Sequence, residues 1–239
     1  MLIAVAGSGN LAQYICEEFP KVGHRVRILS RSIKEHLRIE GCEQVVVDYS
    51  QPQLDDALQD CEVLISTIVD LSSAFIQVHL NLITACQRSQ RCKRFIPSEF
   101  AGNVKDFPDQ PMYFINTHSA IRKTLADQKE IEWTIVCIGF LADYIVPSRN
   151  RYVMDMREGN MIDYENKHFK ITGTGHEPMD VTSARDVASG LASLVTIPNW
   201  EKYTYMSGER TSWWQIVGHV RRRDPEFTAS AITLGQIGR

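Results

Sequence analysis

The stretch Ile3-Ala4-Val5-Ala6-Gly7-Ser8-Gly9-Asn10-Leu11-Ala12 decides the fold of this chain. An apolar run leads directly into Gly-x-Gly-x-x-Ala, and an amphipathic segment follows. A strand, a glycine turn and a helix in this order suit a dinucleotide pyrophosphate, because the helix N-terminus offers N–H groups and a positive dipole end. Gly7 makes the tight turn, Gly9 lets the backbone approach the phosphates, and Ala12 lets the helix pack close to the strand. We therefore predict cofactor binding here, with a purely structural glycine turn as the alternative.

The composition is that of an ordinary globular protein. The 239 residues are 44% hydrophobic and 23% charged, with a formal net charge of −3, so nothing favours binding to nucleic acid. No apolar run approaches the ~20 residues of a membrane span, and the glycine turn follows Met1 too closely for a signal peptide. The six cysteines have neither CxxC spacing nor a nearby histidine pair, so we expect reduced thiols and no metal site. The expectation is a soluble, cytoplasmic protein.

The first 140 residues alternate between short apolar runs and longer amphipathic segments, which is typical of βαβ units around a parallel sheet. After the first strand, further strands are predicted at His24–Leu29, Gln44–Val47, Glu62–Ser66, Arg94–Pro97 and Glu132–Ile138. Helices are predicted at Gln53–Leu58, Ser73–Arg88 and Ile115–Gln128. Residues 1–140 are therefore predicted to form an α/β domain, a Rossmann-type doubly wound parallel sheet.

The pattern changes after Gly139. Residues 141–239 contain a predicted hairpin at Asn160–Thr172, a glycine loop at Gly173–Pro178, a helix starting at Thr182–Asp186, a strand at Tyr203–Ser207 and a helix at Trp213–Val220. We expect this small C-terminal α+β region to bind the substrate, with a crevice between the two parts as the default site for a small molecule. The Trp213–Trp214 pair is interpreted either as core or as the surface of a homodimer.

The residues after the second strand indicate which nicotinamide cofactor fits. An acidic residue about 20 positions beyond the glycines would bind the ribose 2′-hydroxyl of NAD(H). The chain instead has Ser30-Arg31-Ser32, and a guanidinium with two hydroxyls suits a 2′-phosphate. NADP(H) is therefore the predicted cofactor, and a solvated arginine in a surface loop is the alternative. The predicted cofactor-binding residues are Gly7, Ser8, Gly9, Asn10, Leu11, Ser30, Arg31, Asp48, Thr67 and Ser98.

The proton-transfer motif of classical short-chain dehydrogenases, Tyr-x-x-x-Lys, is absent, because no tyrosine has a lysine four residues later. Another family is indicated by Arg94-Phe95-Ile96-Pro97-Ser98-Glu99-Phe100. This stretch is similar to the strand-five motif of the NmrA-like and isoflavone reductase-like atypical short-chain dehydrogenase/reductases. The segment from Ile121-Arg122 to Gly139-Phe140, and Gly173-x-Gly175 followed by Asp186-Val187-Ala188, also look like this family.

The resemblance covers nearly the whole chain and looks closest to fungal members. It implies an NADP(H)-binding Rossmann domain with a small C-terminal substrate region. Activities within the family include reduction of isoflavones and benzylic ethers, while some NmrA-like members are redox-sensing regulators without turnover.

Two departures from the family pattern bear on the chemistry. The family turn, Gly-x-x-Gly-x-x-Gly/Ala, is one residue longer than the turn at Gly7. Reductases of the family carry a catalytic lysine four residues before the arginine that matches Arg122, and this chain has His118 there. A neutral imidazole can act as a general acid or base, but it cannot supply a lysine's permanent charge. The predicted catalytic residues are His118, Ser98 and Glu99; the alternatives are a histidine without a role and a glutamate in a structural ion pair.

Three functions are compatible with the sequence, ranked as follows. The first is an NADP(H)-dependent oxidoreductase that reduces a small aromatic or polyketide-like metabolite, with His118 or a water as proton donor. The second is a non-redox isomerase, cyclase or dehydratase on the same scaffold, with His118 or Glu99 as acid or base. The third is an NADP(H)-sensing regulatory protein that binds a partner protein and turns nothing over.

Overall fold

The computed structural model describes residues 1–70, 72–108, 113–154 and 161–232. The chain divides into two compact units. The first consists of Met1–Cys137 and Arg185–Met206, and the second of Ile138–Ala184 and Ser207–Arg239. Residues 185–206 therefore belong to the same unit as the N-terminal segment, although they lie within the predicted C-terminal region.

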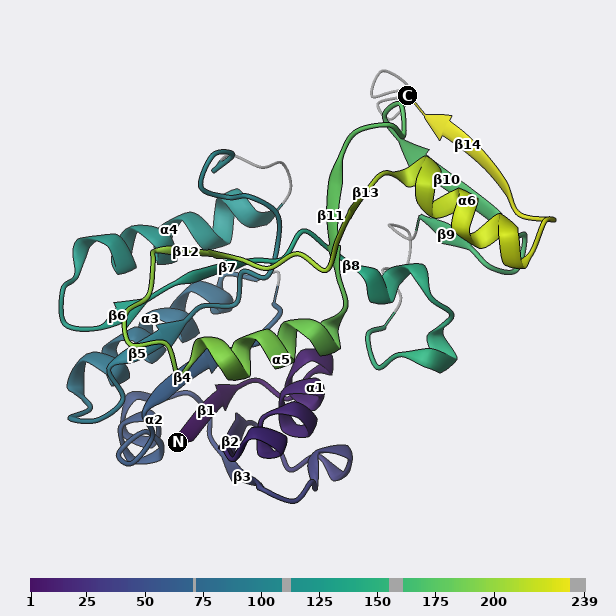
Figure 1. The fold of residues 1–239 in the computed structure, drawn as a ribbon. Coiled ribbons are helices and arrows are strands. Elements are labelled where there is room, and N and C mark those ends of the chain that lie inside the picture. Colours follow the sequence, from purple (N-terminus) through teal and green to yellow (C-terminus); the bar gives the residue numbers. More distant parts are fainter. Residues whose placement is uncertain (71, 109–112, 155–160, 233–239) are drawn as a thin grey trace. The chain divides into compact units, whose positions relative to one another are not determined.

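A fully parallel, six-stranded sheet forms the centre of the first unit (Figure 1). Its order is β3-β2-β1-β4-β5-β6, with β1 at Leu2–Ala6, β2 at Arg25–Ser30, β3 at Cys42–Val46, β4 at Val63–Ser66, β5 at Arg94–Ile96 and β6 at Glu132–Trp133. Every residue of β1 is buried, which explains its uninterrupted apolar run. The strand order reverses between β1 and β4, where doubly wound sheets bind ligands. The predicted Rossmann-type fold is confirmed.

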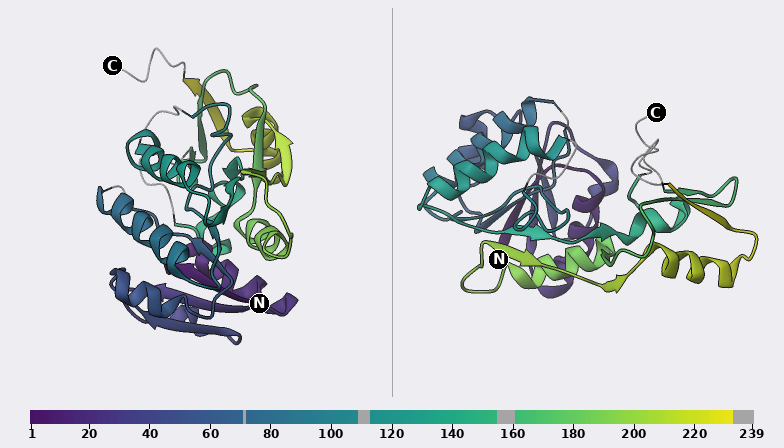
Figure 2. Two further views of the ribbon diagram at one scale, coloured as in Figure 1. Left: turned by 90° about the vertical axis from the view of Figure 1, so that its left-hand side faces the viewer. Right: turned by 90° about the horizontal axis from the view of Figure 1, so that it is seen from above.

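Helices cover both faces of this sheet. They are α1 at Asn10–Glu18, α2 at Gln51–Ala57, α3 at Ala74–Arg88, α4 at Tyr113–Asp127 and α5 at Ala184–Leu194. α2, α3 and α4 pack side by side on one face, while α1 and α5 lie on the other (Figure 2). The core beneath α2–α4 combines small strand residues with large helix residues, among them Ala4, Ala6, Leu54, Leu82 and Leu125. On the opposite face Arg185 of α5 forms ion pairs with Glu17 and Glu18 of α1.

The chain leaves the central sheet at Thr134. The prediction of a single strand at Glu132–Ile138 is wrong, because two strands with different partners meet at Thr134. β6 pairs with β5, whereas β7 (Ile135–Cys137) pairs in parallel with β12 (Tyr203–Tyr205). Hydrogen bonds mark the exchange of partners, because Thr134 N still donates to Phe95 O while Thr134 Oγ1 already bonds Thr204 Oγ1 at 2.9 Å. Alternating burial cannot reveal this change, since both halves of the stretch are buried.

The second unit contains two small sheets and one helix. The strands β8 (Phe140–Leu141), β11 (Met179–Thr182) and β13 (Glu209–Thr211) form one sheet, and β9 (Ile162–Asp163), β10 (His168–Thr172) and β14 (Thr228–Ile232) form the other. β9 and β10 are the predicted hairpin, whose first residue, Asn160, lies outside the described residues. α6 (Trp213–Arg223) buries Trp213 and Val217 against Phe169 and Phe227. None of the helices within the described ranges is both long and apolar enough to cross a membrane.

Candidate functional site

The glycine turn after β1 has the geometry of an anion cradle. Gly7 has a φ of +106°, and a Cβ atom there would lie 2.9 Å from Thr67 Oγ1 at the end of β4. Any side chain at this position would therefore strain the backbone and collide with a neighbouring strand. Gly9, in contrast, has an ordinary φ of −85°, and a Cβ atom there would meet nothing within 4 Å. The open space beside Gly9 is what a phosphate needs for a close approach to the backbone.

The beginning of α1 faces this open space without a competing charge. Gly9 is the N-cap and supplies no side-chain hydrogen bond, and the first helical turn contains no acidic residue. Ala12 is fully buried, so the helix packs closely, as predicted. This turn thus combines the backbone N–H donors of Ser8 to Leu11, a positive helix end and open space beside Gly9, which fits a dinucleotide pyrophosphate.

The end of β2 places a cation next to this turn. β1 and β2 are adjacent, with Ala6 paired to Leu29. Ser30 is buried, and its hydroxyl donates to Ser32 O at 2.7 Å, so it shapes the loop. Arg31 is exposed and forms no ion pair with any residue in the described part of the chain. An uncompensated guanidinium at this edge is suited to a 2′-phosphate.

Two other predicted cofactor residues have defined structural contacts. The Asp48 carboxylate accepts the backbone N–H of Ser50 at 2.8 Å, and Asp48 N donates to Gln53 Oε1 at 2.7 Å. Hydrogen bonds from Ser50 lower the pKa of Asp48, so this carboxylate holds the turn before α2 in its ionised form. Thr67 is buried against Gly7, and its hydroxyl donates to Ala6 O at 3.2 Å.

The turn after β5 brings Ser98 and His118 together. His118, on α4, is 4% exposed, and its Nε2 donates to Ser98 O at 3.1 Å. A carbonyl can only accept, so the proton is on Nε2 and Nδ1 accepts from the Thr117 hydroxyl at 2.7 Å. Burial lowers the pKa of His118, although Glu99 and the Ser98 carbonyl oppose the shift. The imidazole is therefore neutral with both nitrogens engaged, whereas the Ser98 hydroxyl has no hydrogen bond within the described residues.

A second buried histidine, which the sequence did not single out, lies beside His118. The Phe75 ring stacks on His79 at 4.1 Å and on His118 at 4.6 Å, measured between ring centroids. His79 Nδ1 donates to Phe75 O at 2.9 Å, so its Nε2 accepts from the Ser66 hydroxyl at 3.0 Å. Burial lowers the pKa of His79 to about 4, and His118 adds to this shift. The two neutral imidazoles attach α3 and α4 to the ends of β4 and β5.

Glu99 forms a buried ion pair. Arg122 on α4 donates to both of its carboxylate oxygens, Nε to Oε1 at 2.9 Å and Nη2 to Oε2 at 2.8 Å. Burial opposes the charge of Arg122, but the hydrogen bonds and charge of Glu99 outweigh it and raise the pKa of Arg122. A carboxylate held in this way serves as a fixed ion-pair partner, one of the two roles predicted for it.

The glycine motif Gly173-x-Gly175 binds the carboxylate of a nearby residue, Glu177, through its backbone N–H groups. Glu177 accepts the backbone N–H groups of Thr174 at 3.0 Å and Gly175 at 2.9 Å, together with the Thr174 hydroxyl at 2.9 Å. These hydrogen bonds lower the pKa of Glu177 to about 2. Gly173 and Gly175 have φ values of +87° and +78°, which explains the motif as a tight turn closed by an internal anion.

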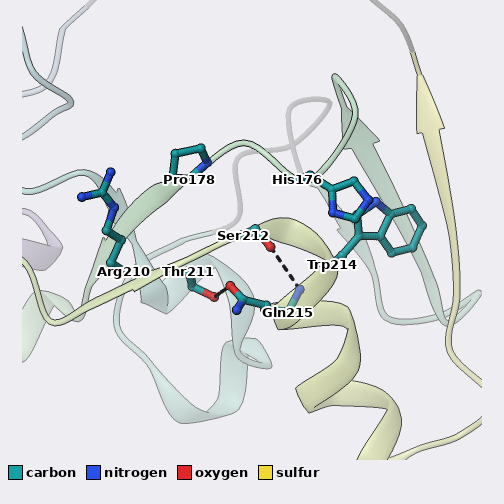
Figure 3. Close-up of a pocket in the computed structure, with 7 residues that line it drawn as sticks. All are labelled: His176, Pro178, Arg210, Thr211, Ser212, Trp214 and Gln215. Carbon is teal, nitrogen blue, oxygen red and sulfur yellow. Dashed lines mark hydrogen bonds between the residues drawn. The ribbon is translucent and has the colours of Figure 1, made fainter.

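A surface cavity of about 480 Å³ lies in the second unit (Figure 3). It is lined by His176, Pro178, Arg210, Thr211, Ser212, Trp214 and Gln215. Ser212 caps α6 by accepting the N–H of Gln215, and the His176 and Trp214 rings lie close together. No predicted catalytic or cofactor residue lines this cavity. Those residues lie instead at the carboxyl ends of β1 to β5 in the first unit, or on α4.

The chain matches known proteins over nearly its whole length. Residues 1–223 match the NmrA-like family. A protein named oxidoreductase swnR from Arthroderma benhamiae is 50% identical over 237 residues, covering 98% of this chain and 78% of that protein. Its namesake from Metarhizium robertsii is 52% identical over 215 residues, covering 89% and 70% of the two chains.

Solved structures of other proteins share the fold of this chain. The leucoanthocyanidin reductase–NADPH complex from Vitis vinifera superposes with a TM-score of 0.80 at 16% identity, covering 99% of this chain and 80% of that one. A complex described as AtPrR2 with NADP+ and (+)pinoresinol gives a TM-score of 0.76 at 19% identity, covering 98% and 79%. Together with the match over residues 1–223 and the half-identical fungal relatives, these findings show that the chain belongs to the NmrA-like family.

Proposed function

We propose that this protein is an oxidoreductase that binds NADP(H) and acts on a small aromatic or polyketide-like metabolite. The observation that carries the proposal is the open space beside Gly9, one strand away from Arg31, which forms no ion pair with a described residue. The oxidoreductase names of the fungal relatives support it, and so do the NADP+ and NADPH in the two solved structures of similar fold. The aromatic ligand in the pinoresinol complex supports the substrate class.

The residues present fit the cofactor at its pyrophosphate and at its 2′-phosphate. The N–H groups from Ser8 to Leu11 would hold the pyrophosphate, and Arg31 the 2′-phosphate. NADPH, when bound, supplies a hydride to the substrate. Ser98 has a hydroxyl available at the carboxyl end of β5 to donate a hydrogen bond to a substrate oxygen or to the nicotinamide amide. The buried contacts of His118 and Glu99 favour roles in holding this turn, and the predicted acid–base role of His118 remains to be tested by mutation.

Titration of NADPH, NADP+ and NADH by calorimetry tests cofactor binding. We expect micromolar NADPH binding that Arg31→Gln weakens by about tenfold or more, since a charged hydrogen bond contributes ~1.5–3 kcal/mol. NADH binding should change little. Arg91→Gln is the matched control, because Arg91 is also exposed but precedes β5, at the amino end of the sheet. Absence of binding by every nucleotide would refute the proposal.

The contacts of His118 favour one second candidate, an NADP(H)-binding regulatory protein without turnover. A neutral, buried imidazole stands where family reductases have a cationic lysine. Assays of NADPH oxidation against a panel of aromatic carbonyls and enones separate the two. Turnover with any member supports the reductase. Tight NADPH binding without turnover, accompanied by cofactor-dependent capture of a partner protein that His118→Ala leaves unchanged, supports the regulator.

A further inference from the structure

Tyr49, in the turn between β3 and α2, has a backbone conformation that a bulky residue seldom adopts. Its φ is +63°, in the left-handed region that favours glycine. Its side chain nevertheless points inward and is 8% exposed. A strained residue of this kind persists only where its surroundings hold it, and such residues concentrate at functional sites.

Hydrogen bonds hold Tyr49 at both its backbone and its side chain. The Tyr49 hydroxyl donates to Leu29 O at 2.7 Å, and Tyr49 O accepts from Asn81 Nδ2 of α3 at 3.0 Å. Asn81 is oriented in turn by Gln77 Nε2, which donates to its Oδ1 at 2.9 Å. A chain of side-chain contacts thus runs from α3 through Tyr49 to the end of β2.

The carbonyl at the end of this chain also binds the glycine turn. Leu29 O accepts the N–H of Gly7 at 2.9 Å, so one oxygen receives both the Tyr49 hydroxyl and the first amide of the turn. Leu29 lies two residues before Arg31. Burial raises the pKa of Tyr49 to about 12, against the opposing influence of the Gly7 N–H and the Arg31 charge, so the hydroxyl keeps its proton at physiological pH.

We propose that Tyr49 is a positioning residue for the cofactor pyrophosphate, because its hydroxyl fixes the Leu29 carbonyl against which the Gly7 turn is built. The inference rests on the proposed NADP(H) binding. Tyr49 does not contact the cofactor in this account; it sets the orientation of the Gly7 amide and hence of the open space beside Gly9. The predicted cofactor residues did not include Tyr49, and no motif in the sequence marks it.

The variant Tyr49→Phe removes the hydroxyl and keeps the ring. Tyr164→Phe is a matched control, because the Tyr164 hydroxyl also donates to a backbone carbonyl, that of Ile145, in the second unit. We expect Tyr49→Phe to raise the Kd for NADPH about fivefold, the effect of one neutral hydrogen bond. The Kd for adenosine 2′-monophosphate, which lacks the pyrophosphate, should stay within about twofold. General destabilisation would weaken both ligands equally, and Tyr164→Phe should weaken neither.

Amide hydrogen exchange of the ligand-free protein provides a readout that does not depend on nucleotide binding. Exchange in the peptide covering residues 1–12 should accelerate in Tyr49→Phe and remain unchanged in Tyr164→Phe. Unchanged exchange in Tyr49→Phe, or an NADPH Kd equal to that of the wild type, would overturn the positioning role. Failure of the wild type to bind NADPH would refute the proposed function alone, since the exchange result would still decide whether Tyr49 fixes the turn.

Discussion

Arg122 holds the Glu99 carboxylate through two nitrogen atoms, and the Glu99 side chain is only 1% exposed. The pair ties α4 to the turn that follows β5, next to Ser98. In such a buried pair the attraction roughly offsets the cost of removing both charges from water. Loss of a single partner is different, because the remaining charge stays buried without compensation.

Glu99→Gln should therefore destabilise the protein by about 3 kcal/mol or more, measured by urea denaturation. The double variant Glu99→Gln, Arg122→Met should recover much of this loss, because it buries no unpaired charge. Asp127→Asn, which breaks the exposed Lys123–Asp127 pair, serves as the control and should cost less than ~0.5 kcal/mol. Equal effects of the two single carboxylate variants would contradict the buried pair.

The stability of the protein should fall as the pH is lowered from about 6.5 to about 4. Burial lowers the pKa of His79 in the folded state to about 4, from the 6.5 that is usual for histidine. Between these values the unfolded chain binds the proton and the native state does not, so acid favours unfolding. Over this range the shift of the His79 pKa lowers the free energy of unfolding by about 3 kcal/mol. The lowered pKa of His118 acts in the same direction.

The variant His79→Gln tests this dependence, because it retains an acceptor for Ser66 but cannot titrate. Its free energy of unfolding, followed with urea across this pH range, should change less with pH than that of the wild type. The exposed His176→Gln should follow the wild type. Parallel curves for His79→Gln and the wild type would show that His79 does not titrate abnormally.

Substitutions of Gly7 and Gly9 should have different effects, one mainly on stability and the other mainly on NADPH binding. Gly9→Ala should cost at most about 1 kcal/mol of stability, because its φ is ordinary and its Cβ would meet open space. It should nevertheless weaken NADPH binding by at least about tenfold, since the methyl group occupies the space for the phosphate. Gly7→Ala should lower the melting temperature markedly, because φ is +106° and Thr67 is too close. Unimpaired NADPH binding by Gly9→Ala would contradict the cradle.

Steady-state kinetics will test the role of His118, with any substrate found in the panel of aromatic carbonyls and enones. If His118 only holds the Ser98 turn, His118→Asn should lower kcat by less than about tenfold and leave the pH profile unchanged, whereas loss of a general acid costs ~10²–10⁴-fold. Ser98→Ala should lower kcat more than His118→Asn does. A loss of activity in His118→Asn that removes an ionisation from the pH profile would establish the acid–base role.

The sequence predicts the parts of this fold that depend on local pattern. The strand, turn and helix around Gly7 follow from glycine spacing and apolar periodicity, and so does the parallel sheet up to β5. The break at Thr134 depends on the returning β12, which lies almost 70 residues later in the chain. Such a choice between two partner strands leaves no trace in alternating apolar residues.

The candidate site shows the same division. The position of Arg31 follows from its distance along the chain from the glycines. The capping of α5 does not follow from local pattern. The helix is predicted to start within Thr182–Asp186, and Asp143, about 40 residues earlier in the chain, accepts the N–H of Ala184 at its first residue. The His79–Phe75–His118 stack and the strained Tyr49 likewise depend on tertiary contacts between separate elements.

The path of the chain between its two units has a consequence for protein engineering. Because residues 185–206 return to the first unit, the nucleotide-binding half cannot be obtained by truncation after Cys137. Such a fragment would lack α5 and β12, which would leave β7 without its neighbour and deprive Glu17 and Glu18 of Arg185. A minimal version of the first unit would have to join Cys137 to Arg185 and end at Met206. Conversely, residues 138–184 are an insertion between two segments of the first unit. A recombinant graft of the second unit from a related protein would have to keep all three points at which the chain passes between the units.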